Sequence, residues 1–137
     1  MRTIPLILTK EEYKLLTDQY ESVTTPVFNK QKLFQELKDA KIVGPQSMPL
    51  NVVSSNSDVL IWNINKNQTF SISIVAEDSP ERGTNKIRVT DPIVVALLGY
   101  PAGAMTEWEM KDGINKFKVI SVGQGRVDDA LAGHHRS

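Results

Sequence analysis

Residues 87–99 read Ile-Arg-Val-Thr-Asp-Pro-Ile-Val-Val-Ala-Leu-Leu-Gly, and they decide the fold. The first three residues predict a short strand, because they include two β-branched apolar side chains. Asp91 is a favoured N-cap, and Pro92 suits the first position of a helix. The apolar run that follows predicts a helix over 93–98, closed by a glycine. A helix so short and so apolar is expected to pack on a sheet.

Strands flank this stretch on both sides. Residues 59–64 and 69–76 show the two-residue alternation of β-strands, and turn-forming residues separate them. Residues 104–110 and 114–122 form a second predicted pair, joined by Lys-Asp-Gly. The sequence therefore predicts a compact, mainly antiparallel sheet with one short helix.

The N-terminal part of the chain is helical in pattern. Thr9 followed by Glu12 is a capping box, and apolar residues then recur at spacings of three and four over 10–21. Asn29 is expected to cap a second helix that ends near Val43, ahead of a Gly-Pro pair. Two short helices joined by a loop predict an antiparallel helical hairpin, which is a short coiled coil.

These elements give an α+β fold class with a simple division of the chain. Residues 1–45 are expected to form the helical hairpin, and residues 46–123 the sheet domain. Residues 44–51 carry two prolines and a glycine and are expected to serve as a linker. Residues 124–137 contain few apolar side chains, so we expect a disordered tail.

Composition excludes several classes of protein. The chain has 137 residues, 16 basic and 16 acidic side chains, and no cysteine. The charge balance, which holds in every segment, removes the broad attraction on which non-specific nucleic-acid binding depends. Without cysteine there is no disulfide framework and no thiolate site. Neither a signal peptide nor an apolar stretch of about 20 residues is present, so we expect a cytoplasmic protein.

Catalytic machinery is not apparent in the sequence. The two histidines, His134 and His135, lie together in the polar tail, where no rigid scaffold would orient them. Gly123 and Gly125 follow the last strand without the helix or the lysine that would complete a phosphate site. We therefore expect a protein that is not an enzyme and that carries no cofactor or metal.

Asp18 and Glu21 are the carboxylates nearest the tip of the predicted hairpin. A carboxylate pair at this place could hold magnesium, which prefers oxygen ligands. The two residues lie three apart on one short helix, and the loop 22–29 adds no acid. A solvated pair is therefore the favoured interpretation.

The order of these motifs resembles a known family. The strand, turn and helix of residues 87–99, the two strands after them and the ending Val119-Ile-Ser-Val122 resemble the C-terminal domain of the GreA/GreB transcript-cleavage factors. The segment 48–57 and the short hairpin are closer to Rnk, the regulator of nucleoside diphosphate kinase, a bacterial relative with the same domain order. The resemblance covers about residues 3–123.

The resemblance implies an FKBP-like C-terminal domain that docks on RNA polymerase at the rim of its secondary channel, with a coiled coil pointing inward. The docking turn of the family corresponds here to Thr90, Asp91 and Pro92. The family pattern has an acidic residue two before the proline, whereas this chain has Thr90 there. The family delivers magnesium from an acidic pair at a long hairpin tip, and this chain has only a short hairpin. The resemblance therefore implies a transcription regulator that occupies the channel without stimulating transcript cleavage.

Two other functions remain open at this point. An FKBP-like fold suggests a peptidyl-prolyl isomerase, with an apolar pocket lined by Trp62, Phe70, Tyr100 and Trp108. The relative's name suggests direct regulation of a nucleotide-metabolising enzyme. A monomer is expected, and a dimer through the apolar helix faces stays possible.

Overall fold

The computed structural model describes residues 5–124, so all of the predicted tail 124–137 except Gln124, including both histidines, lies outside the described residues. The elements, in chain order, are β1 (Ile7–Leu8), α1 (Lys10–Glu21), α2 (Val27–Asp39), β2 (Lys41–Ile42), the 3-10 turn η1 (Pro45–Ser47), β3 (Asp58–Asn63), β4 (Gln68–Val75), β5 (Lys86–Arg88), α3 (Pro92–Leu97), β6 (Met105–Met110) and β7 (Gly113–Gly123). Among the described residues, no helix is long and apolar enough to cross a membrane.

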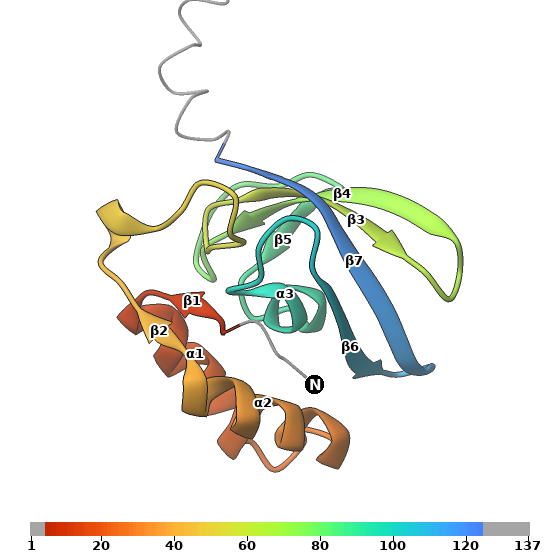
Figure 1. The fold of residues 1–137 in the computed structure, drawn as a ribbon. Helices are drawn as coiled ribbons and strands as arrows, with labels where there is room; N and C mark the ends of the chain where they lie inside the picture. Colours follow the sequence, from red (N-terminus) through yellow and green to blue (C-terminus); the bar gives the residue numbers. More distant parts are fainter. Residues whose placement is uncertain (1–4, 125–137) are drawn as a thin grey trace, which may run out of the picture.

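The main sheet has the strand order β5-β4-β3-β7-β6 and curls around α3 (Figure 1). The hairpin pairs β3–β4 and β6–β7 are antiparallel, as predicted, and β3 also pairs antiparallel with β7. The pair β4–β5 is parallel, so the sheet is mixed. A tight hairpin would make β5 antiparallel to β4. The longer connection 76–85 instead returns the chain to the level of Ser73, so β5 runs in the same direction as β4.

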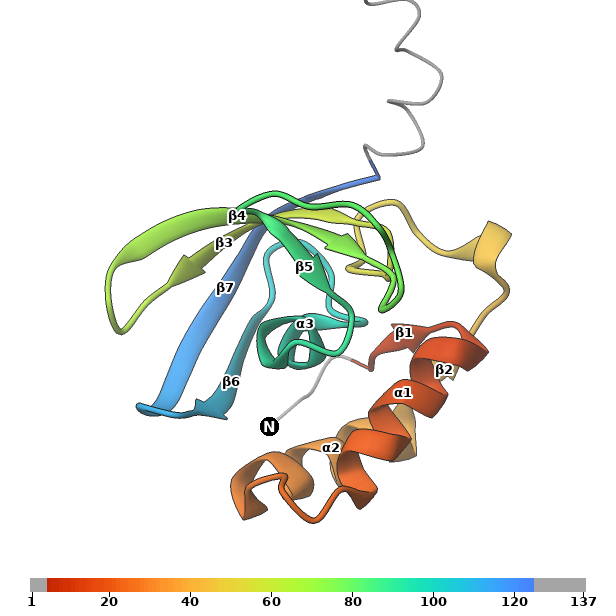
Figure 2. The same ribbon diagram turned by 180° about the vertical axis from the view of Figure 1, so that it is seen from behind.

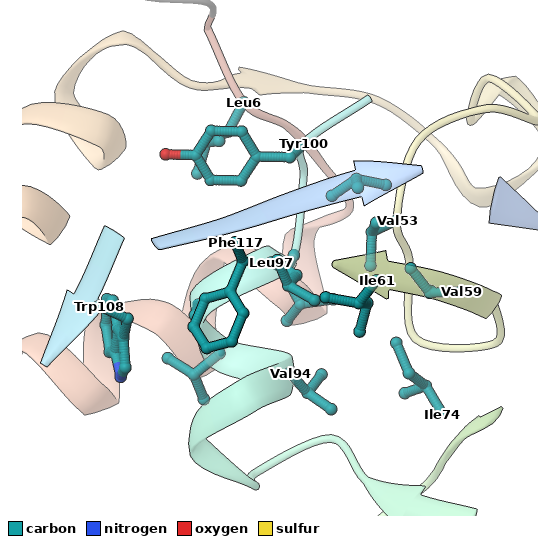
Figure 3. Close-up of a cluster of buried hydrophobic side chains, with 14 of the residues drawn as sticks. Leu6, Val53, Val59, Ile61, Ile74, Val94, Leu97, Tyr100, Trp108 and Phe117 are labelled. Atoms are coloured by element: carbon teal, nitrogen blue, oxygen red, sulfur yellow. The ribbon is translucent and has the colours of Figure 1, made fainter. Parts of the chain in front are cut away.

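Helix α3 lies against the concave face of the sheet and supplies much of the core. Its residues Val94 to Leu97 are buried, and they meet inward-facing side chains of β3, β4 and β7 (Figure 3). The labelled cluster is Leu6, Val53, Val59, Ile61, Ile74, Val94, Leu97, Tyr100, Trp108 and Phe117. Burying each such aliphatic or aromatic side chain contributes about 1.5–3 kcal/mol, so this cluster is the main stabilising element.

Helix α1 confirms the predicted capping box. The Thr9 hydroxyl accepts from the Glu12 amide at 3.2 Å, and the Glu12 carboxylate accepts from the Thr9 amide at 3.1 Å. The second Glu12 oxygen accepts from the Ser55 amide at 2.8 Å. Glu12 is only 3% exposed, so it also ties the start of α1 to the loop before β3.

The second helix differs from the prediction at both ends. Its N-cap is Pro26, and Asn29 lies one turn inside the helix with its side chain buried. The helix ends at Asp39 because the next residues form β2, which pairs in parallel with β1. The Lys41 amide donates to the Leu6 carbonyl at 2.8 Å, and the Val43 amide donates to the Leu8 carbonyl at 2.9 Å. These bonds replace the last helical turn that the sequence predicts.

The helical hairpin packs against the sheet domain. Leu16 of α1 and Leu33 of α2 belong to the same buried cluster as α3 and the sheet. Seen from behind, α1 and α2 run side by side along one flank of the sheet domain (Figure 2). The tip of the hairpin therefore lies beside the β6–β7 end of the sheet.

Candidate partner-docking site

The predicted docking turn is an exposed corner between β5 and α3. Thr90, Asp91 and Pro92 are all exposed. The Asp91 amide donates to the Arg88 carbonyl at 2.9 Å, and the Asp91 carboxylate accepts from the Ile93 amide at 3.0 Å. The predicted N-cap is thus confirmed. One carboxylate oxygen of Asp91 is committed to this cap, and the side chain still lies at the surface.

A second carboxylate reaches the same corner. The Thr90 hydroxyl donates a hydrogen bond to Glu77 Oε1, and both side chains are exposed. Glu77 lies in the loop after β4, thirteen residues before Thr90. Sequence reasoning missed this role, because no short-range spacing links the two residues. Thr90, which stands where the resemblance leads us to expect an acid, therefore has a carboxylate at its hydroxyl.

The turn opens onto a groove on the concave side of the sheet, with a volume of about 1110 Å³. Its apolar lining includes Phe70, which is 36% exposed, because β4 extends past the part of the sheet that α3 covers. The other apolar lining residues are Pro26, Ile72, Ile87, Pro92, Ile93, Met110 and Phe117. A partly exposed aromatic ring in an apolar groove is typical of a site that accepts a side chain of a partner.

Polar contacts fix the mouth of this groove. Asn63 donates to Asn115 at 3.1 Å, and Asn115 donates to Asp112 at 2.9 Å. Asp112 also forms an ion pair with Lys66 at 2.5 Å. The hydrogen bond from Lys66, followed by that from Asn115, lowers the pKa of Asp112. These contacts link the β3–β4 turn to the β6–β7 turn at this end of the groove.

The hairpin tip contributes to the groove through its loop. Thr24 and Pro26 line it together with Asp91 and Pro92. The structure therefore brings the tip loop and the docking turn to one groove. The sequence did not indicate this, because the relation depends on how the hairpin packs against the sheet.

The predicted carboxylate pair at the tip stays at the surface. Asp18 is exposed and forms an ion pair with Lys14 at 3.2 Å, one helical turn earlier. Glu21 is exposed at the last position of α1. Within residues 5–124, no group of three or more His, Asp or Glu side chains could hold a metal ion.

The four aromatic residues suggested for an isomerase pocket lie in different places. Of these four, only Phe70 lines the groove. Trp108 and Tyr100 are buried in the core at 4% and 9% exposure. Trp62 alternates with the buried Ile61 and Asn63 along β3, so it points to the opposite face of the sheet. The described chain therefore lacks the aromatic pocket on which that alternative rested.

Comparisons with known proteins agree with the fold. A family model described as "Transcription elongation factor, GreA/GreB, C-term" matches residues 47–124. The chain is 33% identical over 88 residues to transcription elongation factor GreA of Helicobacter hepaticus, covering 63% of this chain and 53% of that protein. It is 27% identical over 108 residues to GreA of Clostridium botulinum (strain Eklund 17B / Type B), covering 77% and 68%. The chain thus spans about half the length of the first of these relatives.

A solved structure has the same fold. The transcription elongation factor GreA/GreB from Nitrosomonas europaea superposes with a TM-score of 0.59 at 24% identity, over 88% of this chain and 99% of that one. The family match covers more than half of the chain and includes the turn, α3 and the groove strands. This chain therefore belongs to the GreA/GreB transcription elongation factor family, through the C-terminal domain of that family.

Proposed function

We propose that this chain is a transcription regulator of the Gre and Rnk type that binds bacterial RNA polymerase at its secondary channel without stimulating transcript cleavage. It acts as a binding protein rather than an enzyme, needs no cofactor, and works in the cytoplasm, where its partner is. The observation that carries the proposal is the exposed Thr90–Pro92 turn, which opens onto an apolar groove within the domain that matches the family.

The chemistry of this site suggests the surface that it binds. Asp91 and Glu77 place two carboxylates at the corner, and Phe70 and Ile93 offer apolar area beside them. A partner with an apolar side chain next to a basic one complements this arrangement. The site therefore suits a shaped protein surface better than a nucleic-acid backbone, which would meet two negative charges.

The absence of cleavage stimulation rests on the hairpin. Helices α1 and α2 have 12 and 13 residues, so each spans only about 18–20 Å at ~1.5 Å per residue. Asp18 is paired with Lys14, and the tip loop lies against the groove. A short hairpin held beside the sheet domain is poorly suited to carry an ion far into a channel.

Binding to purified bacterial RNA polymerase core enzyme tests the docking site. Asp91→Lys alone would confound docking with the loss of the α3 cap, so Asp91→Ser serves as the matched variant that keeps a capping oxygen. We expect Asp91→Lys and Phe70→Ser to weaken binding at least tenfold, while Asp91→Ser causes a smaller loss. Absence of binding by the wild-type chain would reject the proposed function. Full binding by both Asp91→Lys and Phe70→Ser would reject the proposed docking site.

A cleavage assay tests the second half of the proposal. The chain is added to backtracked elongation complexes, with a GreA protein as the positive control. We expect no additional short RNA products from this chain alone. We also expect it to reduce cleavage by GreA when in excess, because both would compete for one site. Strong cleavage stimulation would contradict the proposal.

A further inference from the structure

The outer face of α2 carries apolar side chains that the fold leaves uncovered. Val27 is 68% exposed and Phe34 is 50% exposed. Together with Gln31 and Lys38 they follow one another at spacings of four, three and four residues, which places them in one row along the helix. This is the spacing at which a helix packs against a neighbouring helix in a coiled coil. The buried Leu33 belongs to the other side of α2, which already faces the core.

A shallow cleft makes this row suitable for a partner side chain. The rings of Tyr20 on α1 and Phe34 on α2 lie 6.1 Å apart at 35°. A hollow of about 640 Å³ is bounded by these two rings and by Lys30, Gln31 and Gln35. An apolar side chain of a docking helix would fit between the rings and the glutamines.

The charges along the row are positive. Lys30 Nζ lies 5.4 Å from the centroid of the Tyr20 ring, and Lys38 Nζ lies 5.9 Å from that of Phe34. Glu36, the carboxylate inside α2, contacts Lys32 and Tyr100 on the inner side of the helix. Glu21 and Asp39 are the last residues of α1 and α2, at the ends of the row. The row therefore ends in Lys38, next to Asp39, and is flanked by Lys30, whose Nζ also donates to the Tyr20 carbonyl. Between its ends the row carries no acid.

We propose that this row together with the adjacent Lys30, called the α2 seam (Val27, Lys30, Gln31, Phe34 and Lys38), docks an acidic amphipathic helix of a protein partner. The inference rests on the proposed function, in which the partner helix belongs to RNA polymerase. Apolar side chains of the helix fill the cleft, and its carboxylates meet Lys30 and Lys38.

Two other occupants fit the seam less well. Single-stranded nucleic acid binds by stacking successive bases on exposed aromatic rings, whereas Phe34 is the one exposed ring of the seam and the neighbouring Tyr20 is half-buried. A second copy of the chain would bring like charges together if two seams met face to face. An acidic helix is the occupant that both the spacing and the charge favour.

The test uses the full chain and purified RNA polymerase core enzyme. We expect Lys30→Glu/Lys38→Glu to weaken binding at least tenfold, and Phe34→Ser to weaken it by a similar factor. The control Lys10→Glu/Lys14→Glu makes the same change of charge on α1, and we expect little effect from it. Circular dichroism establishes that each variant is folded. Unchanged binding by the seam variants, with binding still lost on Asp91→Lys, would overturn the inference and leave the proposed function standing.

Photo-crosslinking gives a readout that does not depend on the stability of a charge variant. A benzoylphenylalanine replaces Gln31 on the seam or, as the control, the exposed Glu11 on α1. We expect position 31 to crosslink to an acidic helical segment of the polymerase, and position 11 not to do so. Crosslinks from position 31 to RNA in an elongation complex, or to a second copy of the chain, would overturn the inference. Failure of the wild-type chain to bind polymerase would overturn the proposed function, and this inference with it.

Discussion

The side chain of Asn29 pairs with the backbone of Glu109 as a neighbouring β-strand would. Its amide nitrogen donates to the Glu109 carbonyl at 3.0 Å, and its oxygen accepts from the Glu109 amide at 2.8 Å. Glu109 lies on β6, which is an edge strand of the sheet. The side chain therefore satisfies two backbone groups of an exposed edge and joins α2 to the sheet. This contact holds the hairpin in the position where its tip loop borders the groove.

Replacing Asn29 with alanine is expected to lower the free energy of unfolding by about 2–3 kcal/mol. Two hydrogen bonds are lost, each with a net value of about 1 kcal/mol, and a site only 1% exposed is left with unpaired backbone groups. Urea denaturation of Asn29→Ala measures the change. Gln31→Ala, an exposed position on the same helix, serves as the control and should differ from wild type by less than about 0.5 kcal/mol. Equal stability of the two variants would mean that Asn29 does not anchor α2.

Among the glycines in residues 5–124, Gly99 is the one where an added methyl group should be most damaging. Its φ is 87°, and a Cβ there would lie 2.9 Å from both Leu6 Cβ and Leu8 Cδ2. We expect Gly99→Ala to destabilise the fold by about 3 kcal/mol or more, because strain at positive φ adds to a clash with buried side chains. Gly103 has a similar φ of 92° with nothing within 4 Å, so Gly103→Ala isolates the backbone strain at about 1 kcal/mol. Thermal unfolding of both variants tests the difference. Comparable losses would show that Leu6 and Leu8 move aside.

Tyr100 should make the protein sensitive to alkaline pH. Its hydroxyl contacts Glu36 and Lys32 in a largely buried cluster. Burial, and then the charge of Glu36, raise the pKa of Tyr100 well above its ordinary value. The raised folded-state pKa means that the stability contributed by the neutral phenol is fully present below about pH 10, the pKa of an unfolded tyrosine, and is lost as pH rises above it.

Lys32 has the opposite effect on stability over part of the same pH range. Burial lowers the pKa of Lys32, against the opposing effect of Glu36, so its contribution to stability increases as pH rises toward its unfolded pKa of 10.5. Above that pH only the loss from Tyr100 continues. Urea denaturation between pH 9 and 11.5 should therefore show a steeper loss of stability in wild type than in Tyr100→Phe. Parallel curves for the two proteins would contradict a buried neutral phenol.

Local patterns predicted α1 and α3 well, because their ends are set by neighbours in sequence. Thr9 with Glu12 and Asp91 with Pro92 supply their own hydrogen-bonding partners within a few residues. The prediction that Asn29 caps the second helix is wrong because its actual partner is distant in the sequence. An N-cap and a bridge to a strand use the same side-chain oxygen as acceptor, and the partner of Asn29 lies 80 residues away.

The groove could not be predicted from the sequence, although the sequence predicts the strands that line it. Alternation places Phe70 on the same face as Ile72 and Ile74, which indicates a buried side chain. Phe70 is partly exposed only because α3 is too short to cover the whole concave face. Likewise, the two-residue strands β1 and β2 give no periodic signal, and their parallel pairing depends on where α2 ends.

The contact between Thr90 and Glu77 predicts that docking depends on the Glu77 carboxylate and on Thr90 holding it at the turn. If Glu77 supplies the carboxylate at this corner, Glu77→Gln should weaken binding to RNA polymerase several-fold, although Glu77 lies outside the turn itself. Thr90→Val, which removes the donor but keeps the shape, should weaken binding to a similar degree because Glu77 is no longer held there. The double variant Thr90→Val/Glu77→Gln should then lose little more binding affinity than either single variant, since the two residues act through one contact. Thr90→Asp/Glu77→Gln, which moves the carboxylate into the turn, should restore binding. Additive losses in the double variant would show that Glu77 and Thr90 act independently. No recovery of binding with Thr90→Asp/Glu77→Gln would show that a carboxylate at this turn is not what the polymerase contacts.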